Sequence, residues 1–284
     1  MKFILVSLLS SSLFAAIHVT DHRREFYEVP DSLKKLSSGV AAVFKTDSLE
    51  HLKTGWKLSA KTETYEKWAE LCPDETYANQ MNPAVCTAFL VAPDRIATAG
   101  HCVANQEVCD SLSFVFDFQI SNEKEFPHSF GKDQVYGCKK LLASSNDPDY
   151  AVIQLDRAVR NRKPFGLSDK APALRTPVIL MGFPHGIPLK VVESGKVQDN
   201  QNSNSETYFE IDSDLFSGNS GSPVLNAETF EVEGIVAVGF GEFEQPIIHP
   251  KTKKPCRYVR RWKKESDATY SWVSRITNLK IEGE

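Results

Sequence analysis

A short loop rich in serine and glycine is the stretch of this sequence best suited to nucleophilic chemistry. Residues 217–223 read SGNSGSP, and small residues flank Ser220 on both sides. Glycines at positions 218 and 221 permit backbone angles that a side chain would forbid, so the hydroxyl of Ser220 can stand on a tight turn. Such a turn can also direct backbone N–H groups at one developing oxyanion. An ordinary glycine-serine loop between strands is the alternative interpretation.

Two further stretches supply the groups that a serine nucleophile needs. His101 lies in TAGHC, directly after the apolar run of residues 89–96. An imidazole titrates near neutral pH and can therefore act as a base. Asp149 lies in DPDYAVIQLD, immediately before a strand-like run, and Asp147 competes with it for the role of the acid that orients the imidazole. A lone histidine is usually structural, so the hypothesis depends on the three motifs together.

These three motifs resemble those of the trypsin/chymotrypsin-like serine peptidases, and within them the bacterial branch that includes the glutamyl endopeptidases. The order His, Asp, Ser is that of this superfamily, whereas α/β-hydrolases place the serine first. The resemblance covers most of residues 38–245. It implies an all-β fold of two six-stranded antiparallel β-barrels with a short C-terminal helix, and a site between the barrels.

The resemblance also implies a role for each site residue. Ser220 is the expected nucleophile and His101 its base. Asp149 is the expected acid, because the family places an aromatic or aliphatic residue and then alanine after it, as Tyr150 and Ala151 do here. The other expected site residues are the oxyanion-hole donors Gly218 and Ser220, and the substrate-binding residues Asp214, Ala237, Val238 and Gly239.

The residue preference at the cut bond is left open by the sequence. Asp214 lies six positions before Ser220, where trypsin-like enzymes carry an acid that selects Arg or Lys. Acids at this position also occur in the bacterial branch without that preference. Glutamyl enzymes use a histidine in the strand equivalent to residues 234–238, and no histidine lies there. Both specificities therefore remain alternatives.

The N-terminus and the cysteines predict a secreted protein, extracellular or periplasmic. Residues 1–16 combine Lys2, an apolar run and small residues, as a secretory signal does. Six cysteines fit an oxidising compartment. The sequence contains no C-x-x-C pair, the spacing typical of a metal site, and we expect neither a metal nor a cofactor. The resemblance implies a Cys86–Cys102 disulfide, and among three pairings of the other four cysteines we expect Cys109–Cys138 and Cys72–Cys256.

Composition excludes several classes of partner. The 284 residues are 41% hydrophobic and 25% charged, enough for one large core or two small ones. A net charge of −4 gives no general attraction to nucleic acid or anionic membranes. We therefore expect no nucleic-acid partner and no stable membrane insertion. The resemblance implies protein or peptide substrates, and we expect a monomer. The basic run at 251–264 is interpreted as a solvated face, with a polyanion contact as the alternative.

Many short strand-like runs separated by turns indicate two β units. They lie at residues 39–44, 86–91, 95–99, 112–118 and 150–156 in the first half, and at 177–182, 190–197, 207–211, 222–225 and 232–239 in the second. A short amphipathic helix is predicted at 63–72 from the spacing of its apolar residues. The resemblance implies a terminal helix at 272–279, and His185 is interpreted as a loop residue.

The predicted organisation has six parts. They are a signal peptide (1–16), an N-terminal segment or short propeptide (17–38), a first barrel with His101 and Asp149 (39–159), a crossing linker (160–176), a second barrel with Ser220 (177–248), and a basic loop with the terminal helix (249–284). We expect residues 17–30 to stay attached in the mature protein and to pack on the second barrel. The function that this predicts is a secreted serine endopeptidase acting through an acyl-enzyme. The alternatives are a catalytically silent binding or adhesion module, and an esterase with the same triad.

Overall fold

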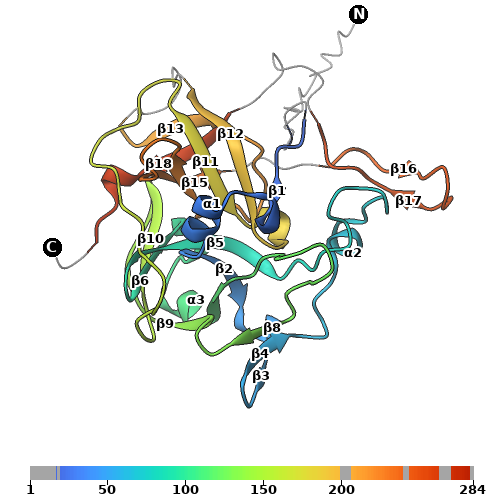
Figure 1. Ribbon diagram of the computed structural model, residues 1–284, viewed down its shortest axis with the longest axis horizontal. Helices are drawn as coiled ribbons and strands as arrows, with labels where there is room; N and C mark the ends of the chain where they lie inside the picture. The colour runs from blue at the N-terminus through green and yellow to red at the C-terminus, as the bar shows by residue number, and fades with distance from the viewer. Residues whose placement is uncertain (1–16, 18–19, 199–205, 239–242, 262–269, 282–284) are drawn as a thin grey trace, which may run out of the picture.

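Two closed antiparallel β-barrels form the body of the protein (Figure 1). The computed structural model describes residues 17, 20–198, 206–238, 243–261 and 270–281. Each half of the chain closes into its own six-stranded ring, as predicted. The predicted signal peptide lies outside the described residues. None of the helices in the described part is long and apolar enough to cross a membrane.

The first barrel has the strand order β10-β6-β5-β2-β7-β9. Five of its strands match predicted runs. Each of these strands has β-branched and aromatic residues, at alternate positions or in a continuous run, that pack into the core. Strand β9 was not predicted, since Gly137, Lys139 and Lys140 interrupt its apolar residues and only Val135 and Tyr136 are buried. The strands are β2 (Val40–Lys45), β5 (Ala84–Ala92), β6 (Arg95–Thr98), β7 (Leu112–Phe116), β9 (Val135–Asn146) and β10 (Asp149–Leu155).

The second barrel closes through the pairing of β12 with β13, giving the ring β12-β11-β14-β15-β18-β13. Five of these strands also match predicted runs. They are β11 (Pro177–Gly182), β12 (Lys190–Gln198), β13 (Tyr208–Asp212), β14 (Pro223–Asn226) and β15 (Val232–Val238), and the sixth is β18 (Ser271–Arg275).

The predicted terminal helix over residues 272–279 is wrong. Residues 271–275 form β18, and only a single 3₁₀ turn, η6 (Ile276–Asn278), follows it. Trp272 faces solvent while Val273 is fully buried, which is the alternation of a strand. Strand β18 hydrogen-bonds β15 on one side and β13 on the other. These ladders close the barrel, and an isolated terminal helix would leave both neighbouring edges unpaired.

Short elements decorate the barrels. The predicted helix over 63–72 is confirmed in a shorter form, α2 (Tyr65–Ala69), where Thr64 Oγ1 accepts the N–H of Lys67 and Glu70 ends the helix at φ 53°. The linker of residues 160–176 contains no helix or strand. The other short elements are β1 (Arg24–Glu25), η1 (Phe26–Glu28), α1 (Asp31–Ser37), η2 (Thr46–Ser48), β3 (Leu49–Leu52), β4 (Gly55–Leu58), η3 (Gly100–Cys102), α3 (Gln106–Asp110), β8 (Ser129–Gly131), η4 (Pro184–Gly186), β16 (Ile247–Ile248) and β17 (Pro255–Cys256).

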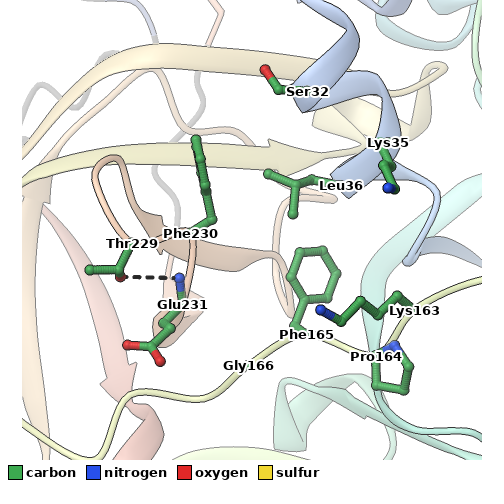
Figure 2. A pocket seen from close by; sticks show the side chains of 10 residues that line it. All are labelled: Ser32, Lys35, Leu36, Lys163, Pro164, Phe165, Gly166, Thr229, Phe230 and Glu231. Carbon is green, nitrogen blue, oxygen red and sulfur yellow. Dashed lines mark hydrogen bonds between the residues drawn. The ribbon is translucent and has the colours of Figure 1, made fainter.

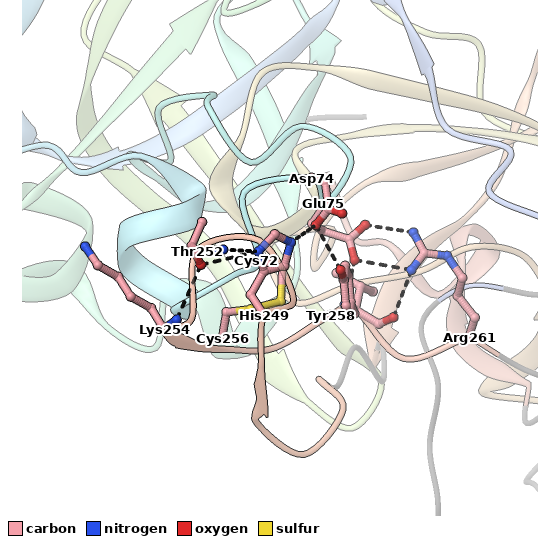
Figure 3. The surroundings of a disulfide bond; sticks show 10 residues. Cys72, Asp74, Glu75, His249, Thr252, Lys254, Cys256, Tyr258 and Arg261 are labelled. Atoms are coloured by element: carbon pink, nitrogen blue, oxygen red, sulfur yellow. Dashed lines mark hydrogen bonds and ion pairs between the residues drawn. A yellow bond between two sulfur atoms is a disulfide. The ribbon is translucent and has the colours of Figure 1, made fainter.

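Three disulfides join the six cysteines, and all three expected pairings are confirmed. Cys86–Cys102 and Cys109–Cys138 lie within the first barrel. Cys72–Cys256 ties the segment after α2 to the β16–β17 hairpin, which extends away from the body in Figure 1. Ion pairs surround this disulfide: Arg261 to Glu75 at 2.7 Å, and His249 to Asp74 at 3.3 Å (Figure 3).

The N-terminal segment packs on the second barrel, as expected for residues 17–30. Strand β1 pairs antiparallel with β12, so that Arg24 lies opposite Val191. The guanidinium of Arg23 is buried between the rings of Tyr77 and Phe216, at 4.9 and 4.3 Å from their centroids. It also binds both carboxylate oxygens of Asp21, at 2.9 and 2.7 Å. Retention of this segment in the mature protein stays a prediction.

Glu25 anchors the same segment through a buried charge. Lys190 is 2% exposed, and its Nζ lies 3.2 Å from Glu25 Oε2 and 2.9 Å from Gln80 Oε1. Burial lowers the pKa of Lys190 to about 8, and Glu25 opposes this. Glu25→Ala leaves the ammonium group without its counter-ion, so we expect a loss of roughly 3–5 kcal/mol in the free energy of unfolding.

Denaturant unfolding at neutral pH measures this loss. The control is Asp31→Ala, which removes the carboxylate of an exposed pair with Lys34 and should change stability little. Equal, small effects of the two substitutions would contradict the prediction.

Candidate active site

His101 and Asp149 form a bidentate contact at one end of the first barrel. His101 lies in η3, directly after β6, and Asp149 is the first residue of β10. These strands are antiparallel neighbours, which brings the two residues together. Nδ1 of His101 lies 2.7 Å from Asp149 Oδ2, and the backbone N–H of His101 donates to Oδ1 at 2.9 Å. The hydrogen bond to Asp149, together with its charge, raises the pKa of His101 against the effect of burial.

The two side chains differ in exposure in the way that general-base chemistry requires. The carboxyl side chain of Asp149 is 10% exposed, whereas the imidazole of His101 is 49% exposed. The buried acid therefore orients the ring through Nδ1, and the other ring nitrogen, Nε2, remains for a second partner. Asp147, the competing acid, lies at the surface, and its N–H donates to Ser145 Oγ at 3.3 Å. Of the two acids, Asp149 is the one hydrogen-bonded to the imidazole.

Two residues of the second barrel hold the backbone of Asp149. Its N–H donates to Tyr208 Oη at 3.2 Å, and its carbonyl accepts from Ser274 Oγ at 2.9 Å. Tyr208 lies on β13 and Ser274 on β18. Sequence reasoning missed both residues, because neither belongs to a local motif and only the pairing of the barrels brings them to Asp149.

The conformation of the serine loop, residues 217–223, requires its two glycines. Gly218 has φ 90° and Gly221 has φ 86°, a region that side chains disfavour. A Cβ at Gly218 would lie 2.4 Å from the carbonyl oxygen of Phe183, and one at Gly221 would lie 2.1 Å from that of Thr87. Ser220 between them is partly exposed. Within the described part of the chain, the N–H groups of Gly218 and Ser220 donate to no acceptor.

Thr87 on β5 joins the serine loop to the first barrel. Its N–H donates to the carbonyl of Ser220 at 2.8 Å, and its hydroxyl donates to the carbonyl of Gly218 at 2.9 Å. The Sγ atom of Cys102, the residue after His101, lies 3.9 Å from the same Ser220 carbonyl. The three predicted residues therefore come from two barrels into one region.

Strand β15 borders this region on the other side of the serine loop. The N–H of Gly221 donates to the carbonyl of Val236 at 2.8 Å. Of the predicted substrate-binding residues, Ala237 is 2% exposed and Val238 ends the strand, whereas Gly239 lies outside the described residues.

Asp214 is covered by the N-terminal segment. Its carboxylate accepts the backbone N–H of His22 at 2.7 Å, and the His22 Nδ1 lies 3.2 Å from the same oxygen. The side chain of Asp214 has no exposed surface in this arrangement. Direct contact with a substrate side chain, which the sequence suggested, would therefore require displacement of His22.

His185 is a loop residue, as interpreted from the sequence. It lies in η4 between β11 and β12 with φ 51°, and it is 5% exposed. Burial, with the charge of Arg23 nearby, lowers its pKa to about 3. Its ring stacks on Tyr65 with centroids 5.2 Å apart, so it is held in an aromatic cluster away from any acid partner.

A possible metal cluster and a large pocket can both be set aside. Cys86, His101 and Cys102 bring candidate ligand atoms within 4.8 Å, but both sulfurs belong to one disulfide. A pocket of about 500 Å³ lies between α1, residues 163–166 and residues 229–231 (Figure 2). Phe165, Leu36 and Phe230 form much of its wall, and no histidine lines it. Pocket size alone therefore does not identify the site.

Comparison with known proteins agrees with this geometry. The family model described as a trypsin-like peptidase domain matches residues 86–235, more than half of the chain and a span that includes His101, Asp149 and Ser220. A glutamyl endopeptidase of Bacillus licheniformis is 30% identical over 156 residues, which are 49% of this chain and 45% of that protein. The chain thus matches less than half of the length of this relative.

Solved structures show the same fold at low identity. A Glu endopeptidase in complex with MPD has a TM-score of 0.51 and 16% identity, over 92% of this chain and 94% of that chain. The Vibrio cholerae VesB protease has a TM-score of 0.51 and 15% identity, over 89% and 65%. The human heparin binding protein has a TM-score of 0.53 and 11% identity, over 91% and 92%. With the family model matched across both barrels, the chain belongs to the trypsin/chymotrypsin-like serine peptidases.

Proposed function

We propose that this protein is an exported serine endopeptidase that cleaves polypeptides through a covalent acyl-enzyme. The observation that carries the proposal is the pairing of His101 with Asp149 through both carboxylate oxygens, at 2.7 and 2.9 Å, beside the serine loop. Ser220 is the proposed nucleophile, His101 the general base and Asp149 the orienting acid. Three disulfides support export to an oxidising compartment.

In the proposed first step, Ser220 Oγ attacks the carbonyl carbon of the scissile bond while its proton passes to His101 Nε2. The tetrahedral intermediate then collapses, the C–N bond breaks, and the imidazolium gives that proton to the leaving amine. Water repeats the sequence on the ester, with His101 again as base, and releases the acid. Throughout, Asp149 stabilises the imidazolium and holds the ring in the tautomer that leaves Nε2 free to accept.

The oxyanion of each tetrahedral intermediate needs donors that are already in position. The backbone N–H groups of Gly218 and Ser220 are the proposed donors, and in the described part of the chain neither is used by another acceptor. Removal of one such donor costs about 10²–10³ in rate in a related enzyme. The acyl part of the substrate is proposed to lie along the end of β15, with Ala237, Val238 and the following residue Gly239 as the proposed partners of its backbone.

A reactive serine distinguishes this enzyme from a silent binding module of the same fold. Ser220→Ala should abolish covalent labelling by a fluorophosphonate probe and lower casein hydrolysis on the order of 10⁶-fold. Ser222→Ala is the matched control in the same loop, since the Ser222 side chain is fully buried and its variant should still be labelled. Labelling that survives in the Ser220 variant would exclude the proposed nucleophile. Activity on casein but not on a simple lipid ester separates a peptidase from an esterase.

The role of Asp149 predicts a change in the pH profile. His101 must be neutral to accept the serine proton, and its raised pKa makes kcat/KM fall at a higher pH than for an unperturbed imidazole. Asp149→Asn removes the main cause of this shift, so the acid limb should move to lower pH while turnover falls by roughly 10⁴. The measurement is kcat/KM between pH 4 and pH 9.

Asp147→Asn is the control, because this exposed neighbour is not bonded to the imidazole. It should leave both the rate and the acid limb close to those of the wild type. A large loss in the Asp147 variant, with near-normal turnover in the Asp149 variant, would reverse the assignment of the acid.

A further inference from the structure

A second cavity, of about 300 Å³, opens beside the serine loop and takes no part in the chemistry above. We call it the tryptophan pocket. Its wall includes Ser217 and Gly218 from the serine loop, Ala84 and Val85 at the beginning of β5, Trp68 on α2, and His185. Gly218 is also a proposed oxyanion donor, so the pocket is continuous with the place where the scissile carbonyl would sit.

The residues that line the pocket and the residue that contacts β15 lie on opposite sides of Ser220 in the sequence of the serine loop. Strand β15 is tied to the serine loop after Ser220, through the hydrogen bond from Gly221 to Val236. The pocket is lined by serine-loop residues that precede Ser220, and no described residue of β15 borders it. If the acyl part of a substrate lies along β15, the polypeptide beyond the cut bond must continue toward Val85 and Trp68. The pocket is therefore placed for the leaving-group side.

The chemistry of the pocket wall is apolar and aromatic. Trp68 is 49% exposed and Val85 is 41% exposed, and these two large side chains face the same cavity. The indole of Trp68 packs against three other aromatic rings, which restrict its rotation. Its centroid lies 6.2 Å from that of Tyr65, 5.7 Å from that of His185 and 6.2 Å from that of Phe243. A rigid aromatic surface of this kind binds another apolar side chain with little loss of conformational freedom.

Among the residues that the structure describes, no ionised side chain lines the pocket. His185 is buried and neutral at physiological pH, and among the described residues neither of its ring nitrogens has a hydrogen-bond partner. The other lining residues are Asn82, Ala84, Val85, Gly186, Ser217, Gly218 and Trp68. A charged substrate residue entering here would lose water without gaining a counter-ion, so the pocket selects against it.

We propose that the tryptophan pocket binds an aromatic or large aliphatic side chain of the substrate, at one of the first two positions after the cut bond. This inference rests on the proposed endopeptidase function. It adds a preference for the residues after the cut bond to any preference for the residues before it. It also gives α2 and the segment between β4 and β5 a role in substrate selection.

The first experiment finds cut sites without assuming any. A mixed peptide library made from a digested proteome is treated with the wild-type protein and with Trp68→Ala, and the cut sites are read by mass spectrometry. We expect wild-type cuts to be followed, within two positions, by Phe, Tyr, Trp, Leu or Met, and rarely by Asp, Glu, Lys or Arg. Trp68→Ala should flatten this preference and leave the residues before the cut unchanged. Trp56→Ala, a partly buried tryptophan on β4 outside this pocket, should retain the wild-type pattern.

The second experiment measures the effect on rate. Two quenched fluorescent peptides share the preferred acyl side and differ only in Phe or Asp at the selected position, and an ethyl ester of the same acyl side lacks that position. Wild-type kcat/KM should favour Phe over Asp by about 10–100-fold, the range that one apolar contact gives. Trp68→Ala should remove most of this ratio and change hydrolysis of the ethyl ester less than twofold. Val85→Glu should lower the rate on the Phe peptide and raise it on a Lys peptide.

The outcomes separate the two proposals. Hydrolysis of the ethyl ester with no preference after the cut in peptides, or an equal loss on all substrates in Trp68→Ala, would overturn the pocket assignment and leave the endopeptidase intact. Absence of both ethyl ester hydrolysis and fluorophosphonate labelling in the wild type would overturn the proposed function, and the inference with it.

Discussion

The hydrogen bonds of Thr87 are the interaction on which the arrangement of the site depends. Each barrel closes on itself, so nothing within one barrel fixes its position relative to the other. Thr87 is fully buried, donates to the carbonyls of Ser220 and Gly218, and accepts the N–H of Phe183 at 3.2 Å. Asp149 makes the complementary contacts with Ser274 and Tyr208. Because buried polar groups are costly when unpaired, these bonds favour one register between the barrels over sliding alternatives.

Buried charges at the N-terminal segment favour one docked position of that segment on the second barrel. Arg23, Glu25 and Lys190 are each 5% exposed or less, and each ionised group is matched by a partner or an aromatic face. Such groups add little net stability compared with apolar replacements, but they penalise any other docking of the segment. The same segment carries His22 onto Asp214. The position of His22 is thus coupled to Asp214, the residue at the position that trypsin-like enzymes use to select the substrate side chain, although His22 and Asp214 lie 192 positions apart.

Local patterns predicted most of the strands, and the family resemblance implied the Cys86–Cys102 pairing, but neither predicted the contacts that cross between barrels. The runs that form β10 and β11 are apolar and bounded by turns, so the local sequence was enough to predict them as strands. The terminal helix at 272–279 was expected from the resemblance alone, and only the edges of β13 and β15, distant in the sequence, decide for a strand. Tyr208, Ser274 and His22 have no local signal, since their roles exist only after the chain has folded.

The Cys72–Cys256 bond has a consequence if the proposed peptidase cuts its own chain. It spans the crossing linker, whereas the other two disulfides close before it. A single self-inflicted nick between the barrels would therefore not release either half, and the two fragments would part on a gel only after reduction. The bond thus keeps the two halves in one covalently linked molecule after cleavage of the linker, which is the longest stretch without helix or strand among the described residues.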